Sequence, residues 1–451
     1  MAKGRYRAEK VQDVSMEQLL SALESPRAVL SVDVAKKAMV GGFSTAEGKM
    51  VKVVRWCHPE QTPIMMGGIE RLRAAGRQVD VVLEPTGTYG ESLRFQSERA
   101  GASVFRVGAM RSHLASQVLD GVASWHDAKS VYVLEHLHRQ GLSEPWPADA
   151  PERRAGRALV NLRELYAKPL QEHQGRLEAV LAAFWPELGE LAGIGSKSVL
   201  ALLAKYGGPG SVAANAEEAA AMLVRSGRGF VGVDKAWAIV ESAARTQGVP
   251  MVPEEVCYLH ALADELLRLE GKVGQAQDVL RERLSEHASV RNMAPVVGWV
   301  TAAVLVAIGC DPAAFASVRQ YVKTLGLNLR VRSSGKHEGK LKLSKRGNAT
   351  ARRYLYLAAL KLIRSDKVVW AWHVKHRGDE GQRLKSVVAV MRKLAKALWH
   401  VARGSPFDAT KLFDVRRLDL NVAPPKPSGR RSGLPRGILA AAKSPTSCAQ
   451  A

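Results

Sequence analysis

AVLSVDVA, residues 28–35, decides the fold of the first part of this 451-residue chain. The segment is apolar on both sides of a single acid, Asp33, as expected for a central strand that is buried on both faces. VDVVLEPTG, residues 79–87, repeats the pattern and reaches an acid, Glu84, where the apolar run ends. ASVFRVGA, residues 102–109, is a third expected strand, and helical stretches separate the three. This alternation predicts an α/β sheet.

The acids of this region predict a metal site. An unpaired charge at Asp33, inside a strand, would cost on the order of several kcal/mol. Glu84 stands at a strand end, where α/β sheets bind ligands. Asp127, in GVASWHDAKSVYVL, is a third candidate, although it can also be read as a dipole-favoured acid in a helix capped by Ser124. Converging carboxylates would bind Mg²⁺, and two such ions would clamp an in-line phosphoryl displacement.

A second site is predicted in NLRVRSSGKHEGKLKLSKRGNATARR, residues 328–353, which we call the basic strip. It holds nine basic residues against one acid, Glu338, and we expect the nine to bind nucleic-acid phosphates. Ser333 and Ser334 are expected in a turn at its centre, where a serine hydroxyl could attack a phosphodiester. The alternative is a solvated lysine-rich loop in which the serines only turn the chain. The nine are Arg330, Arg332, Lys336, Lys340, Lys342, Lys345, Arg346, Arg352 and Arg353.

The overall composition favours a polyanionic partner. The formal charge of +23 and the pI near 10.0 indicate nucleic acid. An acidic membrane is the alternative, but no segment has the one-sided basic and aromatic pattern of a membrane-surface helix. Residues 292–310 carry no charge, yet Pro295 and Gly298 interrupt them, so we expect a buried loop and helix rather than a membrane span.

Cysteine usage and the N-terminus indicate a cytoplasmic protein. The four cysteines are scattered singly, which argues against a disulfide framework or a zinc ribbon and suits a reducing compartment. The N-terminus has no apolar signal core, so secretion is not expected. We therefore expect a cytoplasmic, nucleoid-associated protein.

The chain reads as five successive parts: an N-terminal extension (1–26), the α/β domain (27–145), a helical and coiled-coil region (146–289), a compact domain with the serines (290–415) and a disordered basic tail (416–451). Residues 253–288 have apolar side chains at steps of three and four, which favours a coiled-coil helix for dimerisation or for spanning a distance. Residues 191–207 and 293–309 each place a glycine turn before an apolar helix. Such turns either hold a DNA phosphate or belong to packed helical hairpins.

Taken together, these segments resemble a bacterial family. SVDVAKK, LEPTGTYG and HDAKSVYVLEHL resemble the ribonuclease-H-like (RuvC-like) DEDD domain of an insertion-sequence transposase family that includes the Piv-type invertases and the bridge-RNA-guided recombinases. MAPVVGWVTAAVLVAIGCDPAAF and the segment around the basic strip resemble its C-terminal transposase domain. The matches cover about 110 and about 80 residues, in the order and spacing of the family.

The resemblance implies roles residue by residue. Asp33, Glu84 and Asp127 would be the first, second and fourth acids. The third acid falls on Ser124, which is a departure from the family and leaves Asp120, just upstream, as a substitute. The serine nucleophile falls on Ser333 or Ser334. Spacing to the Ser-Lys-Arg-Gly motif at residues 344–347 favours the first, and adjacency to Gly335 favours the second.

The resemblance also implies a reaction and its partners. Serine attack on DNA would give a phosphoserine-linked strand that is rejoined elsewhere, assisted by Mg²⁺, in a homodimer or tetramer guided by a structured RNA. One rival is a metal-dependent nuclease or Holliday-junction resolvase in which the serines are turn residues. The other is an inactive nucleic-acid-binding relic, to which the departure at Ser124 gives weight.

Overall fold

The computed structural model describes residues 7–85, 87–119, 126–330, 333–334, 337–339, 341–378 and 380–421. The chain divides into two units, residues 1–149 and residues 150–451, and each is described by itself. Most of the expected basic tail, from residue 422 onward, lies outside the described residues.

The N-terminal unit is built on a seven-stranded mixed sheet with the order β1-β4-β3-β2-β5-β6-β7. The predicted α/β class is confirmed, and the three expected strands are β2, β5 and β6. β2, β3 and β4 pair antiparallel, whereas β5 and β6 continue the sheet parallel to β2. The strands are β1 (Glu9–Lys10), β2 (Arg27–Asp33), β3 (Ala38–Thr45), β4 (Met50–Cys57), β5 (Gln78–Leu83), β6 (Ser103–Arg106) and β7 (Glu144–Pro145).

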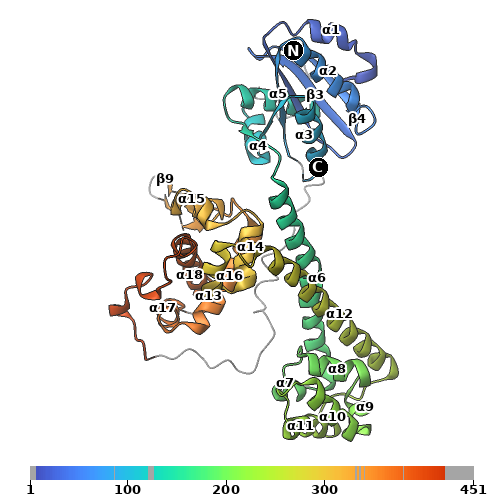
Figure 1. The fold of residues 1–451 in the computed structure, drawn as a ribbon, viewed down its shortest axis with the longest axis vertical. Coiled ribbons are helices and arrows are strands. Elements are labelled where there is room, and N and C mark those ends of the chain that lie inside the picture. Colours follow the sequence, from blue (N-terminus) through green and yellow to red (C-terminus); the bar gives the residue numbers. More distant parts are fainter. Residues whose placement is uncertain are drawn as a thin grey trace. The chain divides into compact units, whose positions relative to one another are not determined.

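Helices cover both faces of this sheet (Figure 1). α2 (Thr62–Ala74) and α3 (Gly90–Arg99) pack on one face, and α5 (Asp127–Arg139) packs on the other. Along β2, Leu30 and Val32 join the core under α2, while Val29 joins the core under α5. Because side chains alternate along a strand, Asp33 shares the face of Val29 and points toward the α5 side.

Two short helices and the first residues complete the unit. α1 (Met16–Ser21) precedes β2, and α4 (Ala109–Ser116) follows β6. The 3₁₀ turn η1 (Val11–Asp13) follows β1, which pairs with β4. Val11, Leu19 and Leu23 are buried in the core of the sheet, so residues 9–23 belong to this unit.

Strands β3 and β4 were not singled out from the sequence, and β3 contains the pair Gly41-Gly42. Both glycines are required by close packing. A Cβ at Gly41 would lie 2.8 Å from the Trp56 ring, and one at Gly42 would lie 2.6 Å from Val131 of α5. In a strand, glycine often marks such a close approach rather than a loop.

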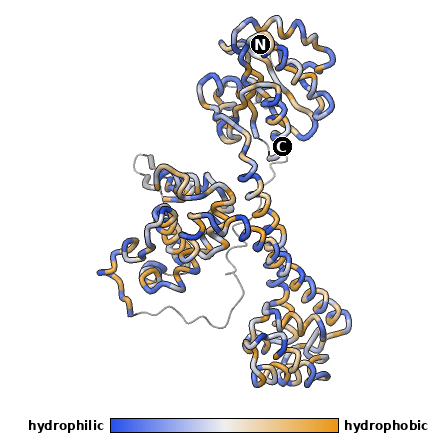
Figure 2. Tube along the Cα trace, viewed as in Figure 1, coloured by the Kyte–Doolittle hydropathy of each residue, from blue (hydrophilic) through white to orange (hydrophobic). Residues whose placement is uncertain are grey.

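The second unit contains two long helices, α6 (Pro151–Phe184) and α12 (Pro253–Leu284), which pack side by side (Figure 1). We call this pair the arm. Apolar and hydrophilic residues alternate along both helices (Figure 2), and the expected apolar seam of α12 is buried at Leu259, Leu262, Leu266, Leu269, Val273 and Leu280. Val279, also expected in the seam, is 43% exposed, because the adjacent Leu280 takes the inward position.

Residues 185–250, which we call the tip, connect the two arm helices. They form α7 (Leu188–Leu191), α8 (Lys197–Tyr206), α9 (Pro209–Ala214), α10 (Ala216–Ser226) and α11 (Val233–Ala244) around one apolar core. The chain enters and leaves the tip at adjacent points. The Val249 amide donates to the Ala183 carbonyl over 2.9 Å, and a Cβ at Gly248 would lie 2.1 Å from the Phe184 oxygen.

Residues 288–421 form a C-terminal bundle with a core of its own. The uncharged segment 292–310 contains the expected buried helix, α14, but its first part is a second helix, α13, where a loop was expected. Pro295 lies inside α13, and the break comes at Gly298 (φ +86°). Within the described residues, no helix is long and apolar enough to cross a membrane. The helices are α13 (Ala288–Val297), α14 (Trp299–Ala307), α15 (Val318–Thr324), α16 (Ala349–Ser365), α17 (Lys367–His376) and α18 (Glu380–Val401), with 3₁₀ turns η2 (Pro312–Ala314), η3 (Ala409–Lys411) and η4 (Val415–Arg417).

Candidate functional site

The structure brings the three predicted acids to one edge of the sheet, which we call the acidic edge. β2 and β5 are parallel neighbours, and their ladder ends with Val32 opposite Leu83. Asp33 and Glu84 each come one residue later, at the carboxyl ends of adjacent strands about 4.8 Å apart. Asp127 is the first residue of α5, the helix that covers this face.

The charges of the acidic edge act on one another. The pKa of Asp33 is raised to about 6, chiefly by burial and also by the charges of Asp127 and Glu84, against a hydrogen bond from Ser130 that lowers it. Like charges held close together disfavour ionisation, and a bound cation removes that penalty. The acidic edge therefore concentrates negative charge at a place where a cation would be stabilised.

Two buried serines hold these carboxylates, and the sequence reasoning missed both. The Ser112 hydroxyl of α4 donates to Glu84 Oε2 over 2.6 Å. Ser130 of α5 hydrogen-bonds to Asp33. A signal for Ser130 was present, because it lies three residues after Asp127 and therefore on the same side of α5.

Asp80 is a structural acid of the same sheet, and its surroundings can be compared with those of Asp33. It is fully buried on the same side of the sheet, toward the other end of β5. Arg27 Nε donates to its Oδ2 over 2.6 Å, and His138 Nε2 lies 3.1 Å from the same oxygen. Asp80 is thus compensated by basic groups, whereas the neighbours that set the pKa of Asp33 include two more acids. Such perturbed groups cluster at functional sites.

The helix start differs from the expectation. His126, and not Ser124, is the N-cap of α5, with its Nδ1 accepting from the Lys129 amide over 3.3 Å. Ser124 and Asp120 lie outside the described residues. Over the described part of the chain, no group of three or more histidine, cysteine, aspartate or glutamate side chains is arranged to hold a metal ion. The charges of Glu84 and Asp127 thus act on Asp33, but the three acids do not form a closed set of metal ligands.

The basic strip is a β-hairpin in two steps. Near its base, β8 (Leu329–Arg330) pairs antiparallel with β11 (Lys342–Leu343). Farther out, β9 (Ser333–Ser334) pairs with β10 (His337–Glu338), with Ser334 opposite His337 and Ser333 opposite Glu338. The expectation that both serines lie in a turn is therefore wrong, because their backbone is paired with the returning strand.

The end of the basic strip is locked against α15. The amides of Ser344 and Lys345 donate to the carbonyls of Asn328 and Gly326 over 2.8 and 3.0 Å. A Cβ at Gly347 would lie 2.2 Å from the Thr324 oxygen, so this approach requires glycine. The Asn348 side chain then caps α16 by accepting from the Ala351 amide over 2.9 Å.

Gly347→Ala is expected to destabilise the C-terminal bundle by about 1–3 kcal/mol, because the added methyl meets backbone on the opposite side. Chemical denaturation of the full chain measures the change. Gly271→Ala on α12, where an added Cβ meets nothing within 4 Å, is the control and is expected to be neutral or stabilising. Equal effects of the two substitutions would contradict the tight approach.

The nine basic residues of the strip differ in their surroundings. Arg330, Lys342, Lys345 and Arg346 are exposed, while Arg332, Lys336 and Lys340 lie outside the described residues. Arg352 donates to the carbonyls of Leu325 and Gly347 over 3.1 and 2.8 Å, so it holds the protein together. Arg353 pairs with Glu164 of the arm.

Glu164 connects the arm to the strip and was not singled out from the sequence. It accepts hydrogen bonds from Arg353 and from the Tyr354 hydroxyl, and Arg163 lies 3.3 Å away. Burial raises the pKa of Glu164, but these hydrogen bonds and the arginine charges outweigh it and leave the pKa below its usual value. No local sequence signal reveals a partner almost two hundred residues away.

Glu164→Ala is expected to destabilise the second unit by about 2–3 kcal/mol at neutral pH, because it leaves the buried Tyr354 hydroxyl and Arg353 without their acceptor. Since the folded pKa is lowered, this stabilisation is present above pH 4.5 and is lost as the pH falls through the folded pKa. Thermal melts at neutral and acidic pH measure both effects. Glu172→Ala, on an exposed part of α6, is the control that should change little.

Comparison with known proteins finds a similarity over the range that contains the second site. Residues 292–373 match the model of the Transposase IS116/IS110/IS902 family, a range that includes the whole basic strip. The chain is also 29% identical over 213 residues to the "Insertion element IS900 uncharacterized 42 kDa protein" of Mycobacterium paratuberculosis. That alignment covers 46% of this chain and 53% of the relative, so the chain spans about half the length of the curated protein it matches.

Proposed function

We propose that this protein is a transposase that cuts and rejoins DNA through a serine nucleophile, because residues 292–373 match the model of the Transposase IS116/IS110/IS902 family. The observation that carries the proposal is that the matched range holds Ser333 and Ser334 within the basic strip. Exposed Arg330, Lys342 and Arg346 would bind the flanking phosphates.

The proposed reaction conserves phosphodiester bonds. The serine Oγ bonds to the phosphorus, the bond from phosphorus to the departing nucleotide oxygen breaks, and that oxygen takes up a proton in place of the one that the serine loses. Attack by a different DNA end then releases the serine. Basic side chains of the strip would stabilise the charge that develops on the phosphate oxygens. No external energy source is needed, because each step exchanges one ester for another.

Asp33, Glu84 and Asp127 would assist as a Mg²⁺ site. The acids supply the oxygen donors that Mg²⁺ prefers, and their mutual repulsion at Asp33 favours a cation. A closed cage is not required, because Mg²⁺ usually keeps several waters and binds through one or two carboxylates and substrate phosphates. When bound, the ion would supply charge stabilisation to a phosphate oxygen. The order of three antiparallel strands followed by two parallel ones supports a ribonuclease-H-like assignment of this unit.

By the same resemblance, a structured RNA would select the DNA sequence. Base pairing would select the site while the protein binds backbone, which agrees with a strip that offers cations rather than a helix for base reading. A homodimer or tetramer would hold two DNA partners together.

The test is to incubate the full chain with element-end DNA, the RNA encoded beside the gene and Mg²⁺, and to resolve the products on a denaturing gel. We expect a DNA strand covalently linked to the protein and dependent on Mg²⁺. Cleavage with free ends and no linked strand would favour a metal-dependent nuclease instead. Salt-sensitive binding without any cleavage would indicate a binding protein.

A further inference from the structure

The positive charge of this chain is concentrated in the C-terminal bundle. Residues 290–421 contain 26 basic and eight acidic residues, whereas residues 1–149 contain 19 and 17, and the tip contains six of each. The basic strip accounts for nine of the 26, so the bundle carries further basic surface outside the strip. A polyanion bound to the bundle is therefore attracted to more than the segment around the two serines.

A cavity of about 720 Å³ opens between α13, α16 and α18 of this bundle. Val296, Leu362 and Phe407 give it apolar walls, and Arg291 and Lys361 bring two exposed cations to it. Sites for small organic groups have volumes of roughly 300–1,000 Å³, with apolar walls and a few polar groups that fix the orientation of the ligand. The cavity has both the size and the composition of such a site.

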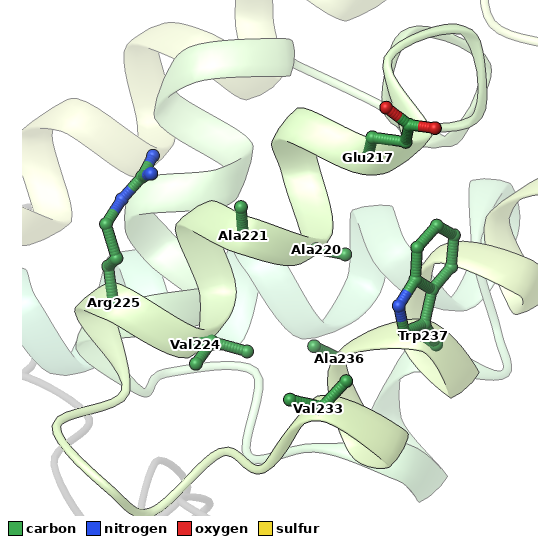
Figure 3. Close-up of a pocket in the computed structure, with 8 residues that line it drawn as sticks. All are labelled: Glu217, Ala220, Ala221, Val224, Arg225, Val233, Ala236 and Trp237. Carbon is green, nitrogen blue, oxygen red and sulfur yellow. The ribbon is translucent and has the colours of Figure 1, made fainter.

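A hollow in the tip, between α10 and α11, provides a comparison. Its volume is about 360 Å³, and six of the eight residues that line it are apolar (Figure 3). It belongs to a segment in which basic and acidic residues are equal in number. Of the two, the cavity of the bundle is the one that combines room for a nucleotide with an attraction for its phosphate.

The wall that holds Phe407 is fixed by hydrogen bonds to other parts of the bundle. Arg403, just after α18, donates to three carbonyls of residues 312–315 over 2.7–3.1 Å. The side-chain nitrogen of Asn292 on α13 donates to the Ala402 carbonyl over 3.1 Å. These bonds hold the loop after α18 in place, so the cavity is formed before any ligand enters it.

The polar groups of the cavity keep hydrogen-bonding capacity that the described residues do not use. Lys361 forms no ion pair with a described residue, and its Nζ would lie 3.5 Å from a Cβ at Gly298. Asp366 accepts from the Val369 amide through Oδ1 over 3.0 Å, while its Oδ2 has no partner among the described residues. The cavity thus offers a cation for an anionic group and a carboxylate oxygen for a donor.

From these groups we infer that the cavity takes up one unpaired nucleotide of a DNA strand bound by the bundle. The base would lie against Phe407 and Leu362, with an amino group on its edge donating to Asp366 Oδ2, and its phosphate would meet Lys361 and Arg291. A purely apolar ligand would leave Asp366 without a donor, and a simple anion would be repelled by it. The inference rests on the proposed binding of DNA by this protein, but not on the cleavage chemistry.

The carboxylate of Asp366 predicts which base is preferred. Cytosine presents an amino donor at N4, whereas thymine presents the acceptor O4 at the same place. The two bases are both pyrimidines, so their comparison isolates this contact. We expect a duplex with one unpaired cytosine to bind at least about tenfold more tightly than the same duplex with one unpaired thymine.

Fluorescence anisotropy of the full chain with three labelled DNA duplexes tests the inference without Mg²⁺, so that binding is measured apart from cleavage. One duplex is fully paired, and the others carry an unpaired cytosine or an unpaired thymine. Asp366→Asn keeps an acceptor for the Val369 amide, and its amide group can turn to serve either base. The preference for cytosine should therefore fall to within about twofold in this variant.

Two cations of α16 form a matched pair for the phosphate contact. Lys361→Gln should weaken the binding of both unpaired duplexes about threefold more than that of the paired one. Arg364→Gln, at an exposed position that does not line the cavity, is the control and should weaken all three duplexes to the same extent.

Two results would overturn the inference: equal affinity of the wild type for the three duplexes, or a preference for cytosine that persists in Asp366→Asn. Competition with deoxycytidine monophosphate identifies the source of the nucleotide. It should displace the unpaired duplex only far above the Kd of that duplex, and displacement near that Kd would assign the cavity to a free nucleotide instead. Binding of none of the three duplexes would contradict the proposed function itself.

Discussion

Asp33→Asn is expected to make the N-terminal unit more stable at neutral pH and, at the same time, to abolish Mg²⁺-dependent DNA cleavage. The substitution removes a half-buried charge that is disfavoured by burial and by Asp127 and Glu84. Asparagine keeps the shape and can still hydrogen-bond to Ser130. Gain of stability with loss of activity is typical of a site that is strained for function.

The pH dependence of this gain follows from the pKa of Asp33. The pKa is 3.8 for the free side chain and about 6 in the folded protein, so the folded state loses stability as the pH rises between the two values. Above pH 6 the full penalty is present, about 1–3 kcal/mol after allowance for solvent screening. Below pH 3.8 both states are protonated, and the stability difference between the wild type and the variant should disappear.

Thermal melts across this pH range, with and without Mg²⁺, measure the stability effect. Mg²⁺ should stabilise the wild type and leave the variant unchanged, because the ion offsets the repulsion that asparagine has already removed. Asp13→Asn, the same chemical change at an exposed position of η1, is the control and should have neither effect. A variant less stable than the wild type at neutral pH would contradict the charge argument.

Replacement of both Ser333 and Ser334 by alanine is expected to eliminate the protein-linked DNA strand, a loss of at least about 10³-fold in its rate of formation. One single substitution should have the full effect and the other little, which would identify the nucleophile. DNA affinity and its salt dependence should stay unchanged, because the cations of the strip are untouched. The denaturing gel and a binding isotherm separate the two properties.

Ser344→Ala is the matched control for this prediction. It removes a hydroxyl from the same strip, one that donates to the Asn328 side chain, and should leave the covalent product in place. A linked strand that survives in the double alanine variant would exclude both serines. If the wild type cleaves DNA without forming any protein-linked strand, the result would favour the metal-dependent nuclease.

Much of the acidic edge could be predicted from local patterns. Apolar runs that end in an acid predicted β2 and β5 and placed Asp33 and Glu84 at adjacent strand ends. The α/β class and the helical character of the remaining chain were likewise evident from periodicity, and both are confirmed. These features depend on residues within one segment, which is what a sequence displays directly.

The misses share a physical cause, which is contact between distant segments. Strands β3 and β4 were not singled out, because the Trp56 ring and Val131 that require Gly41 and Gly42 lie in other elements. Arg353 looked like a free phosphate ligand because its acceptor, Glu164, lies on the arm. Charge can be counted along a sequence, but its partner is fixed only by the fold.

The ends of the tip lie next to each other, which bears on how a segment of this length can be inserted into or removed from the chain. The hydrogen bond from Val249 to Ala183 and the contact of Gly248 with Phe184 bring entry and exit together at the end of the arm. A segment whose ends already touch can be gained or lost without repacking the helices that carry it. The tip therefore has the geometry of an insertable module, whose sequence can vary while the helices of the arm keep their packing.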